Sequence, residues 1–130
     1  MFTAEQIQEA HSKVKSGADF PYYIKEIKAM GVTYYEAYVR DGHIDYYGTN
    51  GYWVSVPDKY KPLTIAATAR TDEFSAELKA HQQGKTDYLT FIKMCAQYGI
   101  EKWTIVMEYM TCTYYDKAGQ TILVETIPQV

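Results

Sequence analysis

Residues 19–56 read DFPYYIKEIKAMGVTYYEAYVRDGHIDYYGTNGYWVSV, and residues 87–124 repeat this pattern 68 positions later without a gap. Eight of the 38 aligned positions are identical, whereas ordinary composition would give about two or three by chance. The identities include the residue that opens each copy, a central glycine and a tyrosine pair: Asp19 and Asp87, Gly31 and Gly99, and Tyr46-Tyr47 and Tyr114-Tyr115. The sequence therefore predicts a fold built from two copies of one unit.

Each copy is expected to begin with a helix. Asp19 is the predicted N-cap and Gly31 the stop of the first one, and Asp87 and Gly99 hold the same places in the second. Between cap and stop of the first copy, an apolar stripe follows helical spacing: Phe20, Tyr23, Ile24, Ile27 and Met30.

A further helix is predicted ahead of each copy. Thr3 and Gln6 form a capping box that opens the first one, which is expected over residues 4–15 with Gly17 as its stop. The corresponding helix of the second half is expected from about residue 72 to Gly84, with three residues facing inward: Phe74, Leu78 and His81.

Three strands are expected after the central glycine of each copy. Asp41-Gly42 predicts a two-residue type I′ hairpin, which pairs Val39 with Ile44. In the second copy Tyr109-Met110 stands at this place, and neither residue favours positive φ. A longer or different turn is therefore expected there.

The turn between the second and third strands is predicted as a three-residue loop, a type I turn closed by a glycine bulge. At residues 49–51 this loop pairs Tyr46 with Val54. At residues 117–119 it pairs Tyr114 with Ile122.

These elements predict a single α+β domain over residues 1–130. The expected architecture is a two-layer sandwich, an antiparallel sheet with helices on one face, made of two ααβββ repeats related by an approximate two-fold. The halves span about residues 1–58 and 70–130, and a connector at about residues 57–69 is expected to hold a short helical turn near residues 63–69.

Composition and charge disfavour several classes of partner. The net charge is −3, and no basic stripe is present, so nucleic acid and anionic membranes are not expected as partners. No apolar run has the length of a membrane span and the N-terminus lacks a signal-peptide pattern, so a cytoplasmic location is expected. Cys95 and Cys112 have no CxxC spacing and are predicted to be buried free thiols.

The outward face of the first hairpin is a candidate interaction surface, because it carries more aromatic residues than a solvated face needs. A self-association or protein contact and internal burial under the second half or the connector are both open explanations. A platform for a small ligand is a third. The residues of this candidate surface are Tyr34, Glu36, Tyr38, Arg40, His43, Asp45, Tyr47 and Trp53.

A second candidate lies between the halves. His11 and His81 each shortly precede a helix-capping aspartate, Asp19 or Asp87. Packing about a two-fold would bring the two imidazoles together as a metal-ligand or general-base arrangement. The simpler explanation is structural, with each histidine hydrogen-bonded to the adjacent helix-to-helix turn, and neither a metal nor a cofactor is predicted.

Known catalytic motifs are not found in the sequence: there is no GxSxG, HExxH, GxGxxG or phosphate-binding glycine loop. An enzyme is therefore the less favoured class. The favoured prediction is a non-enzymatic protein-binding or regulatory module that forms a homodimer or binds a protein partner. The alternative is a small enzyme or ligand-binding protein whose site is centred on His11 and His81.

Three segments also resemble a known family: residues 11–21, residues 81–89 and the stretch TCTYYD at residues 111–116. The chain is similar to small bacterial and prophage-encoded proteins catalogued as domain of unknown function 1398, some of which carry the label "phage envelope protein". The resemblance implies a two-layer α+β fold over nearly the whole chain. It implies no activity and no catalytic residues.

Overall fold

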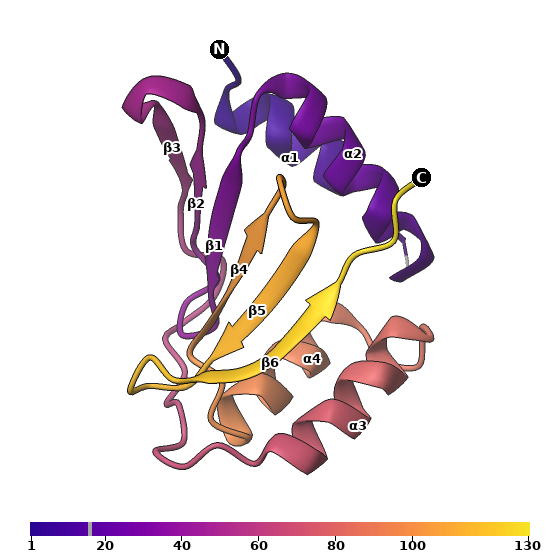
Figure 1. Cartoon of the computed structure of the whole chain (residues 1–130). Helices are drawn as coiled ribbons and strands as arrows, with labels where there is room; N and C mark the ends of the chain where they lie inside the picture. The colour runs from indigo at the N-terminus through magenta and orange to yellow at the C-terminus, as the bar shows by residue number, and fades with distance from the viewer. Residues whose placement is uncertain (16) are drawn as a thin grey trace.

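The structure, a computed structural model, describes residues 1–15 and 17–130 and arranges them as an α+β fold (Figure 1). The described residues contain four α-helices: α1 (Ala4–Ser12), α2 (Phe20–Met30), α3 (Thr71–Gln82) and α4 (Tyr88–Gln97). They also contain six strands: β1 (Tyr34–Tyr38), β2 (Ile44–Tyr47), β3 (Trp53–Val56), β4 (Lys102–Val106), β5 (Thr111–Tyr115) and β6 (Thr121–Thr126). The predicted α+β class is confirmed.

The six strands form one antiparallel sheet in the order β3-β2-β1-β4-β5-β6. The first strands of the two halves, β1 and β4, pair at its centre, and β3 and β6 form its edges. Figure 1 shows α1 and α2 beside one end of the sheet and α3 and α4 beside the other, all on the same side. None of the helices formed by the described residues lies on the opposite side of the sheet.

One hydrophobic core lies between the sheet and the helices. Alternate residues of the central strands point into it, among them Tyr35 and Ala37 of β1 and Ile105 of β4. Ile24 of α2 and Ile92 of α4 are fully buried on the helix side of the same core. The apolar stripes predicted from helical spacing therefore do face the sheet.

The sequence predicts side-chain caps at the N-termini of three helices, α1, α2 and α4. The Thr3–Gln6 capping box of α1 is present, and the Asp87 carboxylate accepts a hydrogen bond from the Thr90 amide at 2.8 Å at the start of α4. The predicted side-chain cap at Asp19 is wrong, because this carboxylate accepts from the Lys15 amide at 2.9 Å instead. A 3₁₀ turn (Gly17–Asp19) runs directly into α2, so Asp19 already has helical backbone angles.

Helix α1 ends at Ser12, three residues before the predicted end at residue 15. The Ser12 hydroxyl donates to the Glu9 carbonyl at 2.6 Å, and the amide of Val14 donates to the carbonyl of His11. This tighter spacing closes the last turn before Gly17 is reached, so Gly17 is not the residue that ends the helix.

The predicted two-residue turn at Asp41-Gly42 is wrong. Val39 does not pair with Ile44, because Ala37 does, and a four-residue loop at residues 39–42 joins the strands. The Asp41 carboxylate accepts from the amide of His43, and Tyr60 occupies the space where a Cβ of residue 42 would stand. These contacts favour the longer loop, and the shift of two residues leaves every side chain on its predicted face.

The β2–β3 loop has the predicted register, with Tyr46 opposite Val54 and residues 49–51 in the loop. Its backbone differs from a type I turn with a glycine bulge, since Asn50 has a φ of 58° in addition to the expected positive φ of 77° at Gly51. Asparagine tolerates the left-handed region better than most residues, so the register survives the change of turn type.

The β4–β5 loop also has four residues, 107–110, and Met110 adopts a φ of 51°. The predicted unusual turn is confirmed.

Beyond the expected loop at residues 117–119, a bulge shifts the β5–β6 register by one, so Tyr114 pairs with Leu123 and not with Ile122. In a regular strand, neighbouring side chains point to opposite faces, so only one of Ile122 and Leu123 could face the core. The bulge allows both to pack against it.

The connector holds no helical turn over residues 63–69, contrary to the prediction. Its backbone is fixed instead by hydrogen bonds to neighbouring elements: Ala66 donates to the Ala96 carbonyl and Arg70 to the Tyr98 carbonyl. Tertiary hydrogen bonds thus satisfy backbone groups that a local helix would have paired internally.

Both cysteines are buried and free, as predicted, and burial raises their thiol pKa values.

We expect stability to be lost at alkaline pH. Burial raises the pKa of Tyr23 and Tyr35 well above the ordinary value, and it raises the pKa of Tyr46 to about 12 although the hydrogen bond from Tyr23 opposes this. Because the folded state favours the neutral phenols, their contribution is fully present below about pH 10 and is lost as pH rises through the folded pKa values. Each such tyrosine should lower the free energy of unfolding by about 1.4 kcal/mol per pH unit in that window.

Urea unfolding between pH 7 and pH 11.5, together with tyrosinate absorbance, measures this loss. Ionisation of these tyrosines should leave the free energy of unfolding unchanged up to about pH 9 and should lower it above pH 10. Ionisation of all 14 tyrosines near pH 10 without loss of fold would contradict the burial of these hydroxyls.

Candidate functional site

The open side of the sheet carries a row of stacked rings across β1, β2 and β3. Tyr34 and Tyr47 stack with ring centroids 4.4 Å apart and planes 7° from parallel. Trp53 continues the row, 6.2 Å from Tyr47. The residues alternate with buried ones along each strand, so the pleat of the sheet places all three rings on one face.

A second row crosses the sheet farther along β1 and reaches into the C-terminal half. His43 stacks on Tyr38 at 4.2 Å, and the Lys102 ammonium lies 5.7 Å from the Tyr38 ring and 5.4 Å from the Tyr115 ring. Lys102 also donates to Glu36 at 2.7 Å. That hydrogen bond raises the pKa of Lys102, so the row is held by an ion pair and by cation–π contacts.

The remaining predicted surface residues lie around these rows. The Ser55 hydroxyl donates to Asp45 at 2.7 Å, and Arg40 is exposed in the β1–β2 loop. Partial burial raises the pKa of Tyr38 and Tyr47, and the Glu36 and Asp45 carboxylates respectively add to that rise. The structure thus gathers seven of the eight predicted residues on one face of the sheet and places Arg40 at its end.

The connector does not cover these rows. Its hydrogen bonds go to the loop at residues 39–42 and to the C-terminal end of α4, which lie at the end and on the helix side of the sheet. Trp53 keeps 54% of its surface exposed, and Tyr34 is exposed as well. We call the two rows together the aromatic face: Tyr34, Glu36, Tyr38, His43, Tyr47, Trp53, Lys102 and Tyr115.

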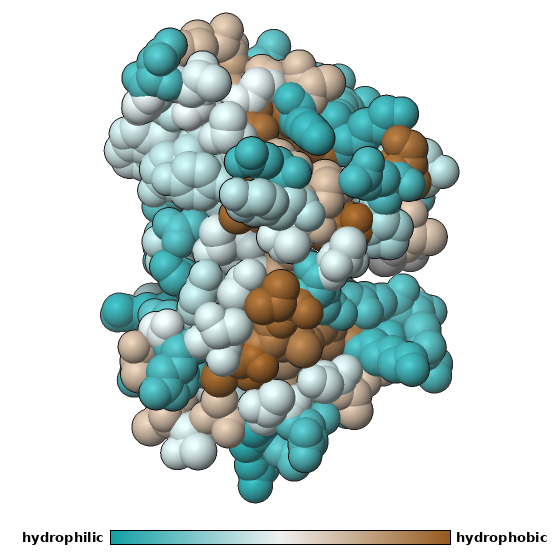
Figure 2. Space-filling model, viewed as in Figure 1, coloured by the Kyte–Doolittle hydropathy of each residue, from teal (hydrophilic) through white to brown (hydrophobic). Residues whose placement is uncertain are grey.

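An apolar area lies on the same open side of the sheet, at its other edge, because Val124 of β6 pairs with the outward-facing Thr113. Figure 2, seen from the side of Figure 1, shows brown apolar surface gathered over β5 and β6. Val124 of the edge strand β6 is 54% exposed. This edge competes with the aromatic face as a contact surface, and it was not predicted because the bulge in β6 turns Val124 outward.

The two histidines of the second candidate site have different neighbours. His11 packs edge-on against Tyr23 at 5.2 Å and Tyr88 at 6.3 Å. His81 stacks on Phe91 at 4.2 Å, and its Nδ1 lies 3.0 Å from the Thr86 hydroxyl. Burial lowers the pKa of both imidazoles. His81 therefore contacts the α3–α4 turn, as expected if this histidine has the structural role of holding the turn between the two helices.

The two aspartates of that site also take separate positions. Asp87 caps α4, and its hydrogen bond from Thr90 lowers its pKa. The 3₁₀ turn that holds Asp19 contacts α3, so the halves do meet close to this residue. Within residues 1–15 and 17–130, no three histidine, cysteine or carboxylate side chains gather in a way that would hold a metal ion.

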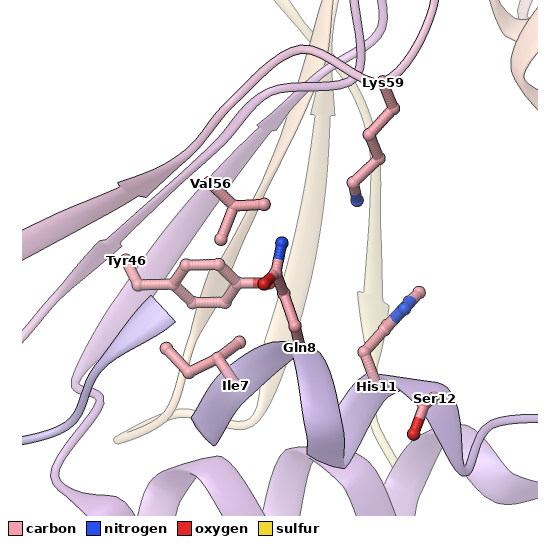
Figure 3. Close-up of a pocket in the computed structure, with 7 residues that line it drawn as sticks. All are labelled: Ile7, Gln8, His11, Ser12, Tyr46, Val56 and Lys59. Atoms are coloured by element: carbon pink, nitrogen blue, oxygen red, sulfur yellow. The ribbon is translucent and has the colours of Figure 1, made fainter. Parts of the chain in front are cut away.

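A half-open cavity of about 260 Å³ lies between α1, β2, β3 and the connector (Figure 3). His11 and Lys59 enter it from opposite sides, and Tyr46 and Val56 form its wall toward the sheet. Sequence reasoning selected His11 but missed Lys59, because the connector offered no motif and its path is fixed by tertiary hydrogen bonds.

The described residues thus form an α+β fold, with four helices and a six-stranded antiparallel sheet that has a small cavity on its helix side. Residues 8–126 match the family described as "Protein of unknown function (DUF1398)". The chain belongs to this family, as the resemblance in three segments indicated. No curated protein matches the chain. In the described part of the chain, no helix has both the length and the apolar character needed to cross a bilayer.

Proposed function

We propose that this protein is a non-enzymatic binding module that forms a homodimer through its aromatic face. The observation that carries the proposal is the pair of cross-strand ring rows on the side of the sheet opposite the four helices of the described residues. Tyrosine and tryptophan provide a large contact area with few rotatable bonds, and they are enriched at protein interfaces for this reason.

The charges of the aromatic face favour a second copy as the occupant. A two-fold interface brings the same surface together from both subunits, so the surface has to be complementary to itself. Glu36 pairs with Lys102 on the face, Asp45 lies opposite Glu36 on β2, and Arg40 lies at the end of the face, so each copy presents charges of both signs. A face with charges of only one sign would repel the same face of a second copy. A face with only basic residues would instead indicate nucleic acid as the partner.

Sedimentation velocity of the purified chain over a range of concentrations tests the proposal. Wild type should form dimers, and Trp53→Ala and Tyr34→Ala should each weaken the dimer by about tenfold or more, as expected for central aromatic residues of an interface. Tyr22→Ala is the matched control, since Tyr22 is 62% exposed and belongs to α2, on the helix side of the sheet.

A second substitution separates the two possible contact surfaces. Val124→Arg places a charge at the β6 edge, the opposite edge from Trp53 on β3, and should weaken a dimer formed through the aromatic face much less than Trp53→Ala does. Loss of the dimer in Val124→Arg, with Trp53→Ala unchanged, would assign the contact to the edge strand. A chain that remains monomeric at all concentrations would refute self-association.

We further propose that the fold is a duplication of one ααβββ unit with an approximate two-fold between the halves. Two features support the proposal beyond the sequence identities. The first hairpin of each half has a loop of four residues, 39–42 and 107–110, at positions that the 68-residue offset relates. The strands that follow the helices, β1 and β4, are antiparallel neighbours at the centre of the sheet.

A further inference from the structure

The cavity behind β2 and β3 has two basic groups and an apolar wall. Ile7, Gln8, His11 and Ser12 reach it from consecutive turns of α1, and Tyr46 and Val56 close it from the sheet. Lys59 extends into it from the connector (Figure 3). The helical spacing of Ile7, Gln8, His11 and Ser12 explains why these four side chains share one side of α1.

The position of Lys59 is fixed by its surroundings. Its backbone amide donates to the Asp41 carbonyl at 2.8 Å, which anchors this part of the connector to the β1–β2 loop. Its ammonium lies 5.8 Å from the centre of the Tyr88 ring, and Figure 3 shows it pointing toward His11. Lys59 is an exposed residue, and partial desolvation of its ammonium at the cavity lowers its pKa.

Neither basic group has an acidic partner. Among the ion pairs of the described residues none involves Lys59 or His11, and no carboxylate lines the cavity in this part of the chain. The only charge that shifts the pKa of His11, after burial, is that of Lys59. A lysine and a histidine that line one cavity without a carboxylate give it a positive lining, which is complementary to an anion.

We infer that this cavity binds a small organic anion, such as a carboxylate with an apolar body. Lys59 and His11 would hold the anionic group, with Gln8 as an additional hydrogen-bond donor beside them. Ile7, Val56 and the Tyr46 ring would contact the apolar body. A volume of about 260 Å³ lies just below the usual range for ligand sites, roughly 300–1,000 Å³, and therefore limits the ligand to a small molecule.

The site is independent of the aromatic face. Tyr46 points to the helix side of the sheet, where its hydroxyl lies 2.8 Å from the hydroxyl of Tyr23, whereas its neighbour Tyr47 points to the open side. Failure of the homodimer proposal would therefore leave the anion site unaffected, and the reverse also holds.

Binding should strengthen as pH falls. A bound anion favours protonated His11, so proton uptake accompanies binding and the affinity rises as pH decreases toward the lowered pKa of the free imidazole. The other titratable groups at the cavity are Lys59 from the connector, Tyr46 from β2, Tyr23 from α2 and Tyr88 from α4. Burial raises the pKa of all three tyrosines, so they stay neutral over this range.

NMR titration of the full-length protein with sodium benzoate, and with neutral benzamide as the matched probe, tests the inference. Benzoate should shift the amide signals of α1 and of residues around Lys59, and benzamide should bind at least tenfold more weakly. The dissociation constant should fall about tenfold between pH 8 and pH 6, and the pKa of His11, read from its imidazole signals, should rise when benzoate is bound.

Lys59→Gln is the test variant and Lys61→Gln its control, because Lys61 is an exposed lysine two residues away. Lys59→Gln should weaken benzoate binding about tenfold or more, while Lys61→Gln should leave it unchanged. His11→Gln should remove the pH dependence and retain part of the affinity. Equal binding of benzoate and benzamide, equal losses in both lysine variants, or no shift with benzoate at millimolar concentration would each overturn the inference.

Discussion

Gly99→Ala is expected to lower the free energy of unfolding by about 3 kcal/mol or more. Gly99 follows α4 with a φ of 83°, a conformation that costs an L-residue about 1–2 kcal/mol. A Cβ at this position would also lie 2.7 Å from the Thr68 carbonyl oxygen and 2.8 Å from the Cα of Ala69. Both are backbone atoms of the connector, so no side-chain rotation relieves the contact, and about 1–3 kcal/mol of overpacking adds to the strain.

Gly84→Ala is the matched control for this effect. Gly84 follows α3 with nearly the same φ, 79°, but a Cβ there meets no atom within 4 Å. Its substitution should cost only the strain of the left-handed conformation, about 1–2 kcal/mol. Urea denaturation of both variants measures the difference, and equal losses at Gly84 and Gly99 would show that the connector does not lie against the end of α4 as described.

Phe74→Ala is expected to lower the free energy of unfolding by about 4 kcal/mol, close to the upper end for a single core substitution. Phe74 is the most deeply buried residue of α3, with 0% of its surface exposed. Its ring packs edge-on against Tyr114 of β5 at 5.0 Å. Truncation removes this contact and leaves a cavity where α3 docks on the sheet, so the helix loses its principal anchor.

Leu89→Ala provides the comparison on the neighbouring helix, since Leu89 of α4 is 46% exposed. It should change stability by about 0.5 kcal/mol or less. Denaturation followed by far-ultraviolet circular dichroism reports both variants. A loss below about 1.5 kcal/mol for Phe74→Ala would mean that the site collapses around the missing ring and that α3 docks by other contacts.

The sequence predicted the features that depend on neighbours along the chain. The Thr3–Gln6 capping box and the Asp87 cap use groups within three residues of one another, and the apolar stripe of α2 follows from helical spacing alone. The β2–β3 register was also predictable, because a one-residue slip would have turned Val54 to the open side.

The features that the sequence did not predict depend on distant segments. Asp41-Gly42 favours a two-residue turn in isolation, but Tyr60 and the connector pack against it and a longer loop results. The bulge in β6 depends on the fit of Ile122 and Leu123 to the core, which no local pattern reveals. The connector lacks its predicted helical turn for the same reason, since α4 provides its hydrogen-bond acceptors.

The residues of the candidate sites also divide into those that local sequence patterns predicted and those that they did not. Strand alternation was sufficient to collect the residues of the open face, and their ring contacts follow from cross-strand neighbours. Lys102 and Tyr115 were missed because the alignment of β4 beside β1 is not encoded in any short stretch. His11 was selected for its place in the repeat, whereas its structural neighbour Lys59 lies 48 residues away in the connector.

The central position of the β1–β4 pair has a consequence for how the chain folds. Each half can form its own helices and hairpins from contacts that are local in sequence, but this pair joins residues such as Glu36 and Thr104, which are 68 positions apart. Closing a loop of this length costs about 4 kcal/mol of chain entropy before any of its contacts are gained. We therefore expect the pairing of β1 with β4 to be the rate-limiting event of folding, after the two halves have acquired their local structure.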